Sequence, residues 1–385
     1  MTLAQYGDYF YLYILMISLV PPIILGLLQK KIKYYGAFLS VLILITTFGL
    51  KSRQMVLFLM FLAGEIILIK GYSLLRKKTD NKYLYYFVLF CSILPIIILK
   101  LSHFTRFSTL GFIGLSYLNF KAIQMIIEIY DNNIKEISIL KTLYFFIFFP
   151  VLTSGPIDRS KRFNDDLEKK IERKEYINDY LIPGIEHIAR GIGYKFVLAA
   201  LISVLWMDKI PKDVTFINSL NYMYAYSLYL FFDFAGYSAF AVGTSYILGI
   251  RTPENFNKPF ISKDMKEFWN RWHISLSKWF GDYIYSRFVL NSMRKKRFKN
   301  RIIASHVGQM ITMGIMGIWH GLEWFYIIYG LYQGVALVLT DIYQRKSVFY
   351  KNHKKEKWFQ YIQIVITFHI ACFGLLLFSG YLFKK

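Results

Sequence analysis

The sequence predicts an all-α integral membrane protein that crosses the bilayer many times, with about 10–12 transmembrane helices. Hydrophobic residues make up 55% of the 385 residues and aromatic residues 19%, whereas charged residues make up only 18%, less than in a typical soluble domain. Apolar runs at residues 9–28, 83–99 and 358–383 are each long enough to cross a hydrocarbon core of roughly 30 Å as a helix. Such runs recur along most of the chain, so the protein is predicted to be polytopic.

The run at residues 9–28 is the first predicted span. It lacks a basic leader and a small-residue cleavage site, so we expect it to be retained. Basic residues are dense in the loops at 30–33 and 70–82 and sparse at 51–53 between them. Because basic loops stay in the cytoplasm, this alternation predicts that the N-terminus lies outside the cell.

The middle of the chain departs from a simple series of spans. The apolar run at residues 143–154 is short for a span and ends in Ser154-Gly155-Pro156, which is typical of a re-entrant segment. The run at residues 216–250 is too long for one helix, and we expect Asp233 and Gly236 to break it. Irregular backbone is tolerated at membrane depth only where protein or a water-filled cavity surrounds it. This region is therefore predicted to build a cavity.

Aromatic and basic residues are interleaved in the segment 268–288. Rings at this density are typical of an amphipathic helix at headgroup level or of a partly re-entrant helix. Residues 287–301 then hold seven basic residues and no acidic one. We predict that this second segment lies in the cytoplasm.

The formal net charge of +23 first suggests a nucleic-acid partner. A nucleic-acid-binding protein would carry its basic residues on a polar domain, which this sequence lacks, so we expect no nucleic acid. The charge instead indicates cytoplasmic loops and contact with anionic lipid headgroups, and it suits an acidic protein partner. Cys91 and Cys372 both lie in apolar runs, which favours buried thiols over a disulfide framework or a cysteine metal site.

His320 is the sharpest candidate for chemistry. It lies in Gly317-Ile318-Trp319-His320-Gly321 between two apolar runs, and ionisable groups at bilayer depth are costly and therefore candidates for function. A neutral histidine acts as a general base near neutral pH. The alternative is a histidine that only hydrogen-bonds a neighbouring helix.

His273 is a weaker candidate from the residues alone. On a continuous helix it would share a face with Trp269 and Leu276. The alternative is an interfacial residue near the headgroups. His187 and His306 are expected to be structural.

Several other kinds of site lack their motifs. The sequence has no G-x-x-x-x-G-K-[ST] or G-x-G-x-x-G loop, no H-E-x-x-H or compact metal-ligand set, and no G-x-S-x-G turn. Nor does it show the two matching halves expected of many transporters. The residues alone therefore predict a membrane protein with a polar cavity and a candidate histidine base.

Five stretches form an ordered set between about residues 145 and 335. They are Phe149-Pro150-Val151-Leu152-Thr153-Ser154-Gly155-Pro156-Ile157-Asp158-Arg159, Phe231-Phe232-Asp233-Phe234-Ala235-Gly236-Tyr237-Ser238, Thr252-Pro253-Glu254-Asn255-Phe256-Asn257-Lys258-Pro259-Phe260, Phe268-Trp269-Asn270-Arg271-Trp272-His273-Ile274-Ser275-Leu276-Ser277 and Met316-Gly317-Ile318-Trp319-His320-Gly321. Together they resemble the bacterial branch of the membrane-bound O-acyltransferase family. The resemblance implies one membrane domain with re-entrant and interfacial helices around a central funnel, in which residues 1–140 form peripheral spans, 141–345 the catalytic core and 346–385 a C-terminal span.

Within this branch, the run from Ser154 to Ser160 and the chain length are more similar to members that D-alanylate teichoic acids than to alginate-type O-acetylating members. The resemblance then implies transfer of D-alanine from a phosphopantetheine thioester, carried by an acidic D-alanyl carrier protein in the cytoplasm. The implied product is D-alanylated (lipo)teichoic acid outside the plasma membrane of a Gram-positive bacterium. No permanently bound cofactor and no metal are implied. Further implied partners are the teichoic acid acceptor, the lipid bilayer, and a membrane-associated protein of the same pathway or a small relay protein.

The resemblance also implies roles for single residues. The family's near-invariant histidine falls on His320, the implied general base, and its second histidine falls on His273, implied to orient the thioester or acceptor or to stabilise the oxyanion. Supporting candidates are Asn270, Arg271, Asp233 and Trp319. The first three are alternatively structural partners buried in the membrane. Candidates for binding the carrier, alternatively an ordinary basic loop, are Phe288, Val289, Leu290, Arg294, Lys295, Lys296 and Arg297.

Three other functions stay open at this point. One is a polysaccharide O-acetyltransferase of the alginate type, which differs in its acyl group. Another is a lipid or acyl transporter without transferase chemistry, and the third is a scaffold that presents the carrier to a separate transferase.

Overall fold

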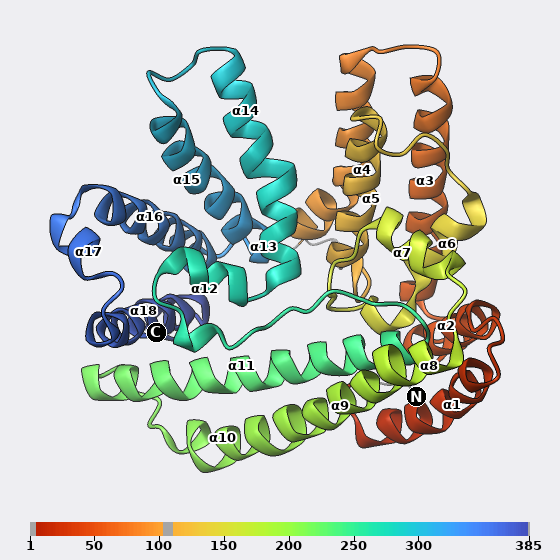
Figure 1. Ribbon diagram of the computed structural model, residues 1–385, viewed down its shortest axis with the longest axis horizontal. Coiled ribbons are helices and arrows are strands. Elements are labelled where there is room, and N and C mark those ends of the chain that lie inside the picture. Colours follow the sequence, from red (N-terminus) through yellow and green to blue (C-terminus); the bar gives the residue numbers. More distant parts are fainter. Residues whose placement is uncertain (1–4, 103–110, 384–385) are drawn as a thin grey trace. The chain divides into compact units, whose positions relative to one another are not determined.

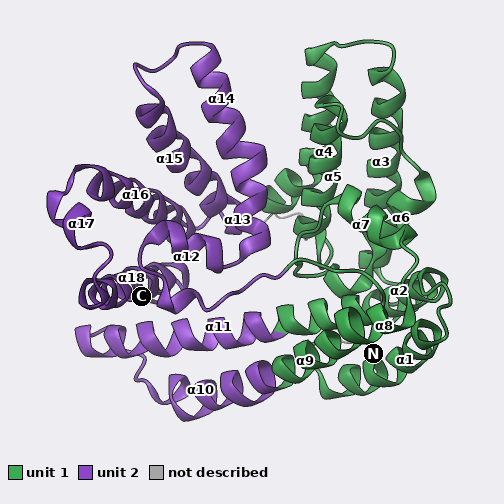
Figure 2. Ribbon diagram, viewed as in Figure 1, with its two compact units in different colours: residues 1–192, 237–253 green, residues 193–236, 254–385 purple. Residues whose placement is uncertain are grey.

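The computed structural model describes residues 5–102 and 111–383 of the chain (Figure 1). Within these ranges the chain folds into helices and contains no strand, which confirms the predicted all-α class. The chain forms two compact units (Figure 2): unit 1 is residues 1–192 with 237–253, and unit 2 is residues 193–236 with 254–385.

Seven helical segments of the described ranges are long and apolar enough to cross a bilayer, which confirms a multi-pass membrane protein. They are Tyr9–Leu27, Arg53–Arg76, Lys82–Ser102, Arg173–Lys209, Arg301–His320, Trp324–Lys346 and Lys357–Phe378. Seven is fewer than the expected count of about 10–12. The length criterion leaves out shorter apolar helices such as Lys33–Phe48, which has 16 residues.

Unit 1 is built mainly from the N-terminal helices. It holds α1 (Tyr9–Leu27), α2 (Lys33–Phe48), α3 (Arg53–Arg76), α4 (Lys82–Ser102), α5 (Leu115–Tyr130), α6 (Ile139–Ile147), a 3₁₀ turn (Phe149–Val151), α7 (Ser160–Glu168), α8 (Arg173–Tyr176), a π-helical turn (Ile177–Leu181), α9 (Ile182–Gly191) and the end of α11 (Phe216–Ile247). Helix α5 packs against α3 and α4, and 12 of its 16 residues are buried. Its buried Lys121 donates a hydrogen bond to the carbonyl of Phe145 in α6 at 2.7 Å, as a buried polar group requires.

The apolar run at residues 143–154, predicted to end at Ser154-Gly155-Pro156, is not one helix in unit 1. Helix α6 ends at Ile147, a 3₁₀ turn follows, and the chain then passes through Gly155 at φ 77°. A Cβ at Gly155 would lie 2.9 Å from the ring of Tyr117, so both the backbone angle and the space require glycine. Next to it, the Asp158 carboxylate is buried and pairs with the guanidinium of Arg162. The insertion of this segment into the membrane stays a prediction.

Unit 2 holds most of the C-terminal half. It contains most of the π-helical segment Ile192–Ala199, α10 (Ala200–Leu205), a 3₁₀ turn (Met207–Lys209), the first part of α11, a 3₁₀ turn (Pro259–Ile261), α12 (Met265–Arg271), α13 (Ile274–Phe280), a π-helical turn (Gly281–Tyr285), α14 (Ser286–Arg294), α15 (Arg301–His320), α16 (Trp324–Lys346), α17 (Val348–His353), α18 (Lys357–Phe378) and a 3₁₀ turn (Tyr381–Phe383). Side chains cap three of these helices. Asp264 accepts from the first turn of α12, Asn300 accepts from Ile303 N in α15 at 3.0 Å, and Ser347 accepts from Tyr350 N in α17 at 3.0 Å. Helix α16 packs against α15, α18 and α12.

The predicted break at Asp233 and Gly236 is wrong, because α11 is one continuous helix of 32 residues. Asp233 forms an ion pair with Lys195 from the preceding helical segment. A Cβ at Gly236 would lie 2.7 Å from the backbone nitrogen of Lys195. The two residues therefore let another helical segment approach α11 closely and do not interrupt it.

The predicted common helical face of Trp269, His273 and Leu276 is also wrong. Helix α12 ends at Arg271 and α13 begins at Ile274, and between them His273 adopts a left-handed backbone with φ 45° and ψ 52°. A right-handed helix cannot pass through such a residue.

Candidate active site

His320 is the last residue of α15, where the following Gly321 adopts an extended backbone and ends the helix. Its half-buried imidazole has aromatic neighbours on several sides. The ring centroids of Trp319 and Phe378 lie 4.6 and 4.9 Å from it, and those of Tyr329 and Tyr326 lie 6.1 and 6.2 Å from it. These rings limit the access of water to the imidazole, which suits a proton acceptor in a reaction that water would waste.

Close packing of α15 on α16 places the two tyrosines of α16 beside His320. A Cβ added at Gly317 would lie 2.5 Å from the carbonyl oxygen of Tyr326 and 3.0 Å from the Cα of Gly330. Small residues at a helix crossing let two backbones approach each other in a membrane protein. The glycine three residues before His320 is thus part of what positions the aromatic wall.

His273 occupies the break between α12 and α13. A left-handed backbone at a residue other than glycine is uncommon, and such residues concentrate at functional sites. The imidazole is 4% exposed and packs edge-to-face against Phe234 of α11, with ring centroids 4.8 Å apart. Phe256 lies on another side, with its centroid at 6.5 Å.

The segment around Asn255 holds this break in place. Ile274 N donates to the carbonyl of Asn255 at 2.9 Å, and Asn257 N donates to the carbonyl of Arg271 at 2.9 Å. The Asn255 side chain adds two further bonds from Ser275. Two of the stretches singled out in the sequence therefore meet at His273, and backbone groups left open by the end of the helix find partners.

The surroundings of His273 favour the neutral form of its ring. Burial, together with the neighbouring His320, lowers the pKa of His273 from 6.5 to about 3. The His273 ring, which lies outside the seven candidate spans, is therefore neutral at physiological pH. A neutral imidazole offers an N–H donor or a lone pair, and it carries no imidazolium charge.

The supporting candidates occupy different settings in unit 2. Trp319 adjoins His320. Arg271 pairs with Glu267 at 2.6 Å and Asp233 pairs with Lys195, as the structural alternative expects, while Asn270 is exposed. Trp319 therefore lies beside His320, whereas ion pairs engage Arg271 and Asp233.

One buried cluster was missed from the sequence. The 5%-exposed Asp341 side chain of α16 accepts hydrogen bonds from Lys266 at 2.5 Å, Arg345 at 2.6 Å and His306 at 2.8 Å. In addition, Trp269 Nε1 of α12 donates to Gln333 Oε1 of α16 at 3.2 Å. These bonds hold α12, and thus the start of the His273 break, against α16. The sequence signal was an acidic residue within an apolar run, which a functional or structural partner must neutralise.

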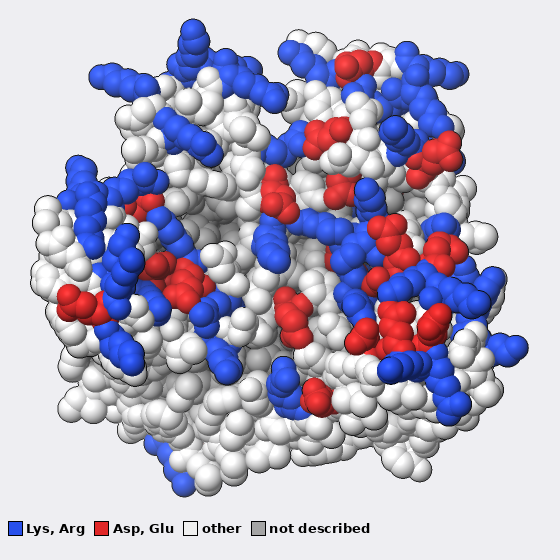
Figure 3. Space-filling model, in the orientation of Figure 1, with Lys and Arg blue, Asp and Glu red and all other residues white. Residues whose placement is uncertain are grey.

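The basic tip between α14 and α15, residues 294–301, carries the predicted charged residues on the surface. Arg294, Lys295, Lys296 and Arg297 are all exposed, and Figure 3 shows only basic charged side chains at this tip, at the upper left of the view. Of the apolar candidates, Leu290 is 57% exposed and Phe288 is half-buried.

Val289 differs from its apolar neighbours because it is 7% exposed and faces Gly308 of α15. The Val289 side chain therefore packs inside unit 2 and is not on the surface that a carrier would contact. Met293, one turn after Leu290 and 38% exposed, is the second apolar side chain that this surface offers.

Sequence comparisons agree with the five stretches. The family model described as MBOAT, the membrane-bound O-acyltransferase family, matches residues 42–383. The chain is 41% identical to a protein named teichoic acid D-alanyltransferase from Bacillus subtilis (strain 168), over 98% of each chain. It is 40% identical to a protein of the same name from Streptococcus thermophilus, over 99% of this chain and 96% of the relative.

A second group of relatives is more distant. The chain is 32% identical to the probable alginate O-acetylase AlgI of Pseudomonas aeruginosa, over 59% of this chain and 42% of the relative. The family match covers both histidines and most of both units. The chain belongs to the membrane-bound O-acyltransferase family.

Proposed function

We propose that this protein transfers D-alanine from a carrier-protein phosphopantetheine thioester to a hydroxyl acceptor, for D-alanylation of teichoic acid. The observation that carries the proposal is the similarity to teichoic acid D-alanyltransferases over nearly the whole of both chains. The alginate O-acetylases match over a smaller share of the chain. The proposed setting is the plasma membrane of a Gram-positive bacterium, with the N-terminus outside.

His320 is the proposed general base. It takes the proton of the acceptor hydroxyl while the oxygen attacks the thioester carbonyl. The carbon–sulfur bond then breaks, and the phosphopantetheine sulfur leaves and receives a proton as a thiol. One thioester is consumed for each ester formed, so this step needs no ATP.

His273 is proposed to orient the thioester or the acceptor. Its lowered pKa leaves the ring neutral, so its contribution is a hydrogen bond in a fixed direction. The left-handed backbone and the hydrogen bonds of the Asn255 segment support such a role, because they fix the backbone position from which the His273 side chain extends.

The carrier is proposed to dock on the basic tip. Exposed lysine and arginine side chains at residues 294–297 suit an acidic surface, and Leu290 and Met293 add apolar area. Complementary charge raises the rate of encounter and is weakened by salt.

The acyl group can be tested in cells that lack the gene. Teichoic acid from these cells is treated with mild base after complementation with the wild-type chain or an empty vector, and released D-alanine and acetate are both measured. We expect the wild-type chain to restore D-alanine and leave acetate unchanged. Restoration of acetate without D-alanine would instead support the polysaccharide O-acetyltransferase.

A further inference from the structure

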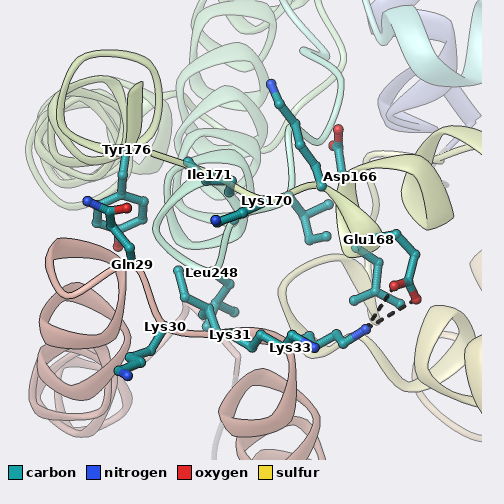
Figure 4. A pocket seen from close by; sticks show the side chains of 16 residues that line it. Gln29, Lys30, Lys31, Lys33, Asp166, Glu168, Lys170, Ile171, Tyr176 and Leu248 are labelled. Atoms are coloured by element: carbon teal, nitrogen blue, oxygen red, sulfur yellow. Dashed lines mark hydrogen bonds and ion pairs between the residues drawn. The ribbon is translucent and has the colours of Figure 1, made fainter. Parts of the chain in front are cut away.

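A lysine-rich pocket lies within unit 1, whereas both histidines belong to unit 2. It is formed by the end of α1, the loop before α2, the residues that follow α7, and the segment after α11 (Figure 4). Its volume is about 200 Å³. Pockets that enclose a whole small molecule typically measure about 300–1,000 Å³, so this one suits a single charged group.

Positive charge dominates the pocket lining, which has five lysines and two carboxylates. The lysines are Lys30, Lys31, Lys33, Lys169 and Lys170, and the carboxylates are Asp166 and Glu168. Each carboxylate already has cationic or N–H partners: Glu168 pairs with Lys33 at 3.0 Å, and Asp166 accepts from Arg162 at 2.6 Å.

The remaining cations are the ones open to a ligand. Lys169 pairs with Glu175, whereas Lys30, Lys31 and Lys170 form no ion pair with a carboxylate in the described part of the chain. In Figure 4 the Lys170 ammonium lies above Leu248, while the Lys30 side chain points away from Leu248. Lys31 and Lys170 are therefore the two lysines chosen for substitution.

The floor of the pocket is apolar and fixed. Tyr176 is fully buried, donates to the carbonyl of Ile247 at 2.9 Å and lies so close to α1 that a Cβ at Gly26 would meet its ring at 2.3 Å. Leu248 and Ile171 complete this apolar side. An apolar floor below a cationic rim matches the boundary between a lipid's headgroup and its chains.

The pocket directly follows the end of a candidate span, which also suggests that it lies at the boundary between lipid headgroups and chains. Helix α1 is a candidate span that ends at Leu27, and the first lysine of the pocket follows three residues later. Clusters of lysine directly after a span lie at the level of the phosphates, and basic pockets there bind anionic headgroups.

We propose that this pocket binds the phosphate group of an anionic phospholipid, with Lys31 and Lys170 as its cationic contacts. A soluble phosphate compound offers the same charged group, but the apolar floor and the end of a span favour the lipid. The inference is independent of the proposed acyl transfer.

Native mass spectrometry of the full-length protein in detergent tests this site with phosphatidylglycerol, phosphatidylcholine and inorganic phosphate as probes. The test variant is Lys31→Gln/Lys170→Gln, and the control is Lys354→Gln/Lys355→Gln, which removes the same charge from exposed lysines outside the pocket. We expect wild type and control to retain phosphatidylglycerol at least about five-fold better than phosphatidylcholine, and the test variant to lose most of this preference.

Two results would overturn the site. Equal retention of phosphatidylglycerol by the test variant and wild type would show that Lys31 and Lys170 do not bind the lipid. Equal occupancy by inorganic phosphate without lipid would assign the pocket to a soluble phosphate compound. A thermal unfolding curve of each variant checks that the protein is folded in all arms.

Discussion

Asn255 accepts two hydrogen bonds from Ser275 through its side-chain Oδ1, from the backbone N–H at 3.2 Å and from the hydroxyl at 2.6 Å. Ser275 lies two residues after His273, so these bonds fix the chain directly beyond the left-handed turn. The Thr252–Phe260 stretch (residues 252–260) therefore has a physical task, which is to hold the turn that presents His273.

Replacing Asn255 with Ala leaves the buried Ser275 hydroxyl and N–H without this acceptor. An unsatisfied buried polar group costs about 1–3 kcal/mol, so we expect a lower thermal unfolding temperature in detergent and reduced acyl transfer. Asn352→Ala, at an exposed position of α17, is the control. Wild-type unfolding and transfer in Asn255→Ala would show that the turn does not depend on these bonds.

The backbone and ring of His273 can be separated by comparing His273→Gly with His273→Ala. Both remove the imidazole, but only glycine adopts φ 45° without strain. We expect the glycine variant to be more stable by about 1 kcal/mol, while both variants lose transfer. The measurements are thermal unfolding and transfer on the same preparations. Full transfer by the glycine variant would show that the His273 imidazole is not needed for the reaction.

The crossing of α15 and α16 offers a matched pair of glycines. A Cβ at Gly317 would meet the backbone of α16, whereas a Cβ at Gly314, one turn earlier on the same helix, would have no neighbour within 4 Å. We expect Gly317→Ala to destabilise the protein by about 1–3 kcal/mol through overpacking and to lower transfer by moving Tyr326. Gly314→Ala should be neutral or stabilising by up to about 1 kcal/mol, because alanine favours helix.

Thermal unfolding of the two alanine variants, followed by transfer assays, checks this pair. Equal stability of Gly317→Ala and Gly314→Ala would mean that α15 and α16 can move apart without a loss of stability. That result would contradict the close packing at Gly317.

Much of the architecture followed from run lengths and composition, because long apolar segments have few alternatives to membrane helices. His320 was found for a related reason: an ionisable residue between apolar runs stands out. His273 was harder, because its site depends on a left-handed turn held by Asn255. Periodicity assumes a continuous helix and could not reveal that turn.

Asp233 and Gly236 were misread because the same residues can break a helix or serve its packing. The choice between these two roles depends on Lys195, which pairs with Asp233 and lies close to Gly236. Val289 was misread in a similar way, since an apolar residue beside a basic loop looks exposed until its partner helix is known. Asp341 was overlooked because its partners Lys266 and His306 lie 75 and 35 residues away along the chain.

Charge reversal at the basic tip tests carrier docking. In Lys295→Glu/Lys296→Glu we expect binding of an acidic carrier protein to fall at least about ten-fold at low salt, mainly through slower association. The wild-type interaction should weaken as salt rises. The control Lys354→Glu/Lys355→Glu changes the net charge equally at exposed lysines after α17.

Surface plasmon resonance with full-length protein in nanodiscs measures this association. If the tip variant binds the carrier as the control does, while its unfolding curve matches wild type, docking takes place elsewhere.

His320 is proposed to carry the acyl transfer, and a reconstituted assay measures that transfer without the rest of the cell. Proteoliposomes receive D-alanyl carrier protein with labelled D-alanine, and ester formed on lipoteichoic acid is measured for wild type, His320→Ala and His369→Ala. His369 is an exposed histidine of α18 and serves as the control. We predict a loss of about 10²–10⁴-fold for His320→Ala and near wild-type transfer for His369→Ala. Transfer at the wild-type rate by folded His320→Ala would show that His320 is not the general base.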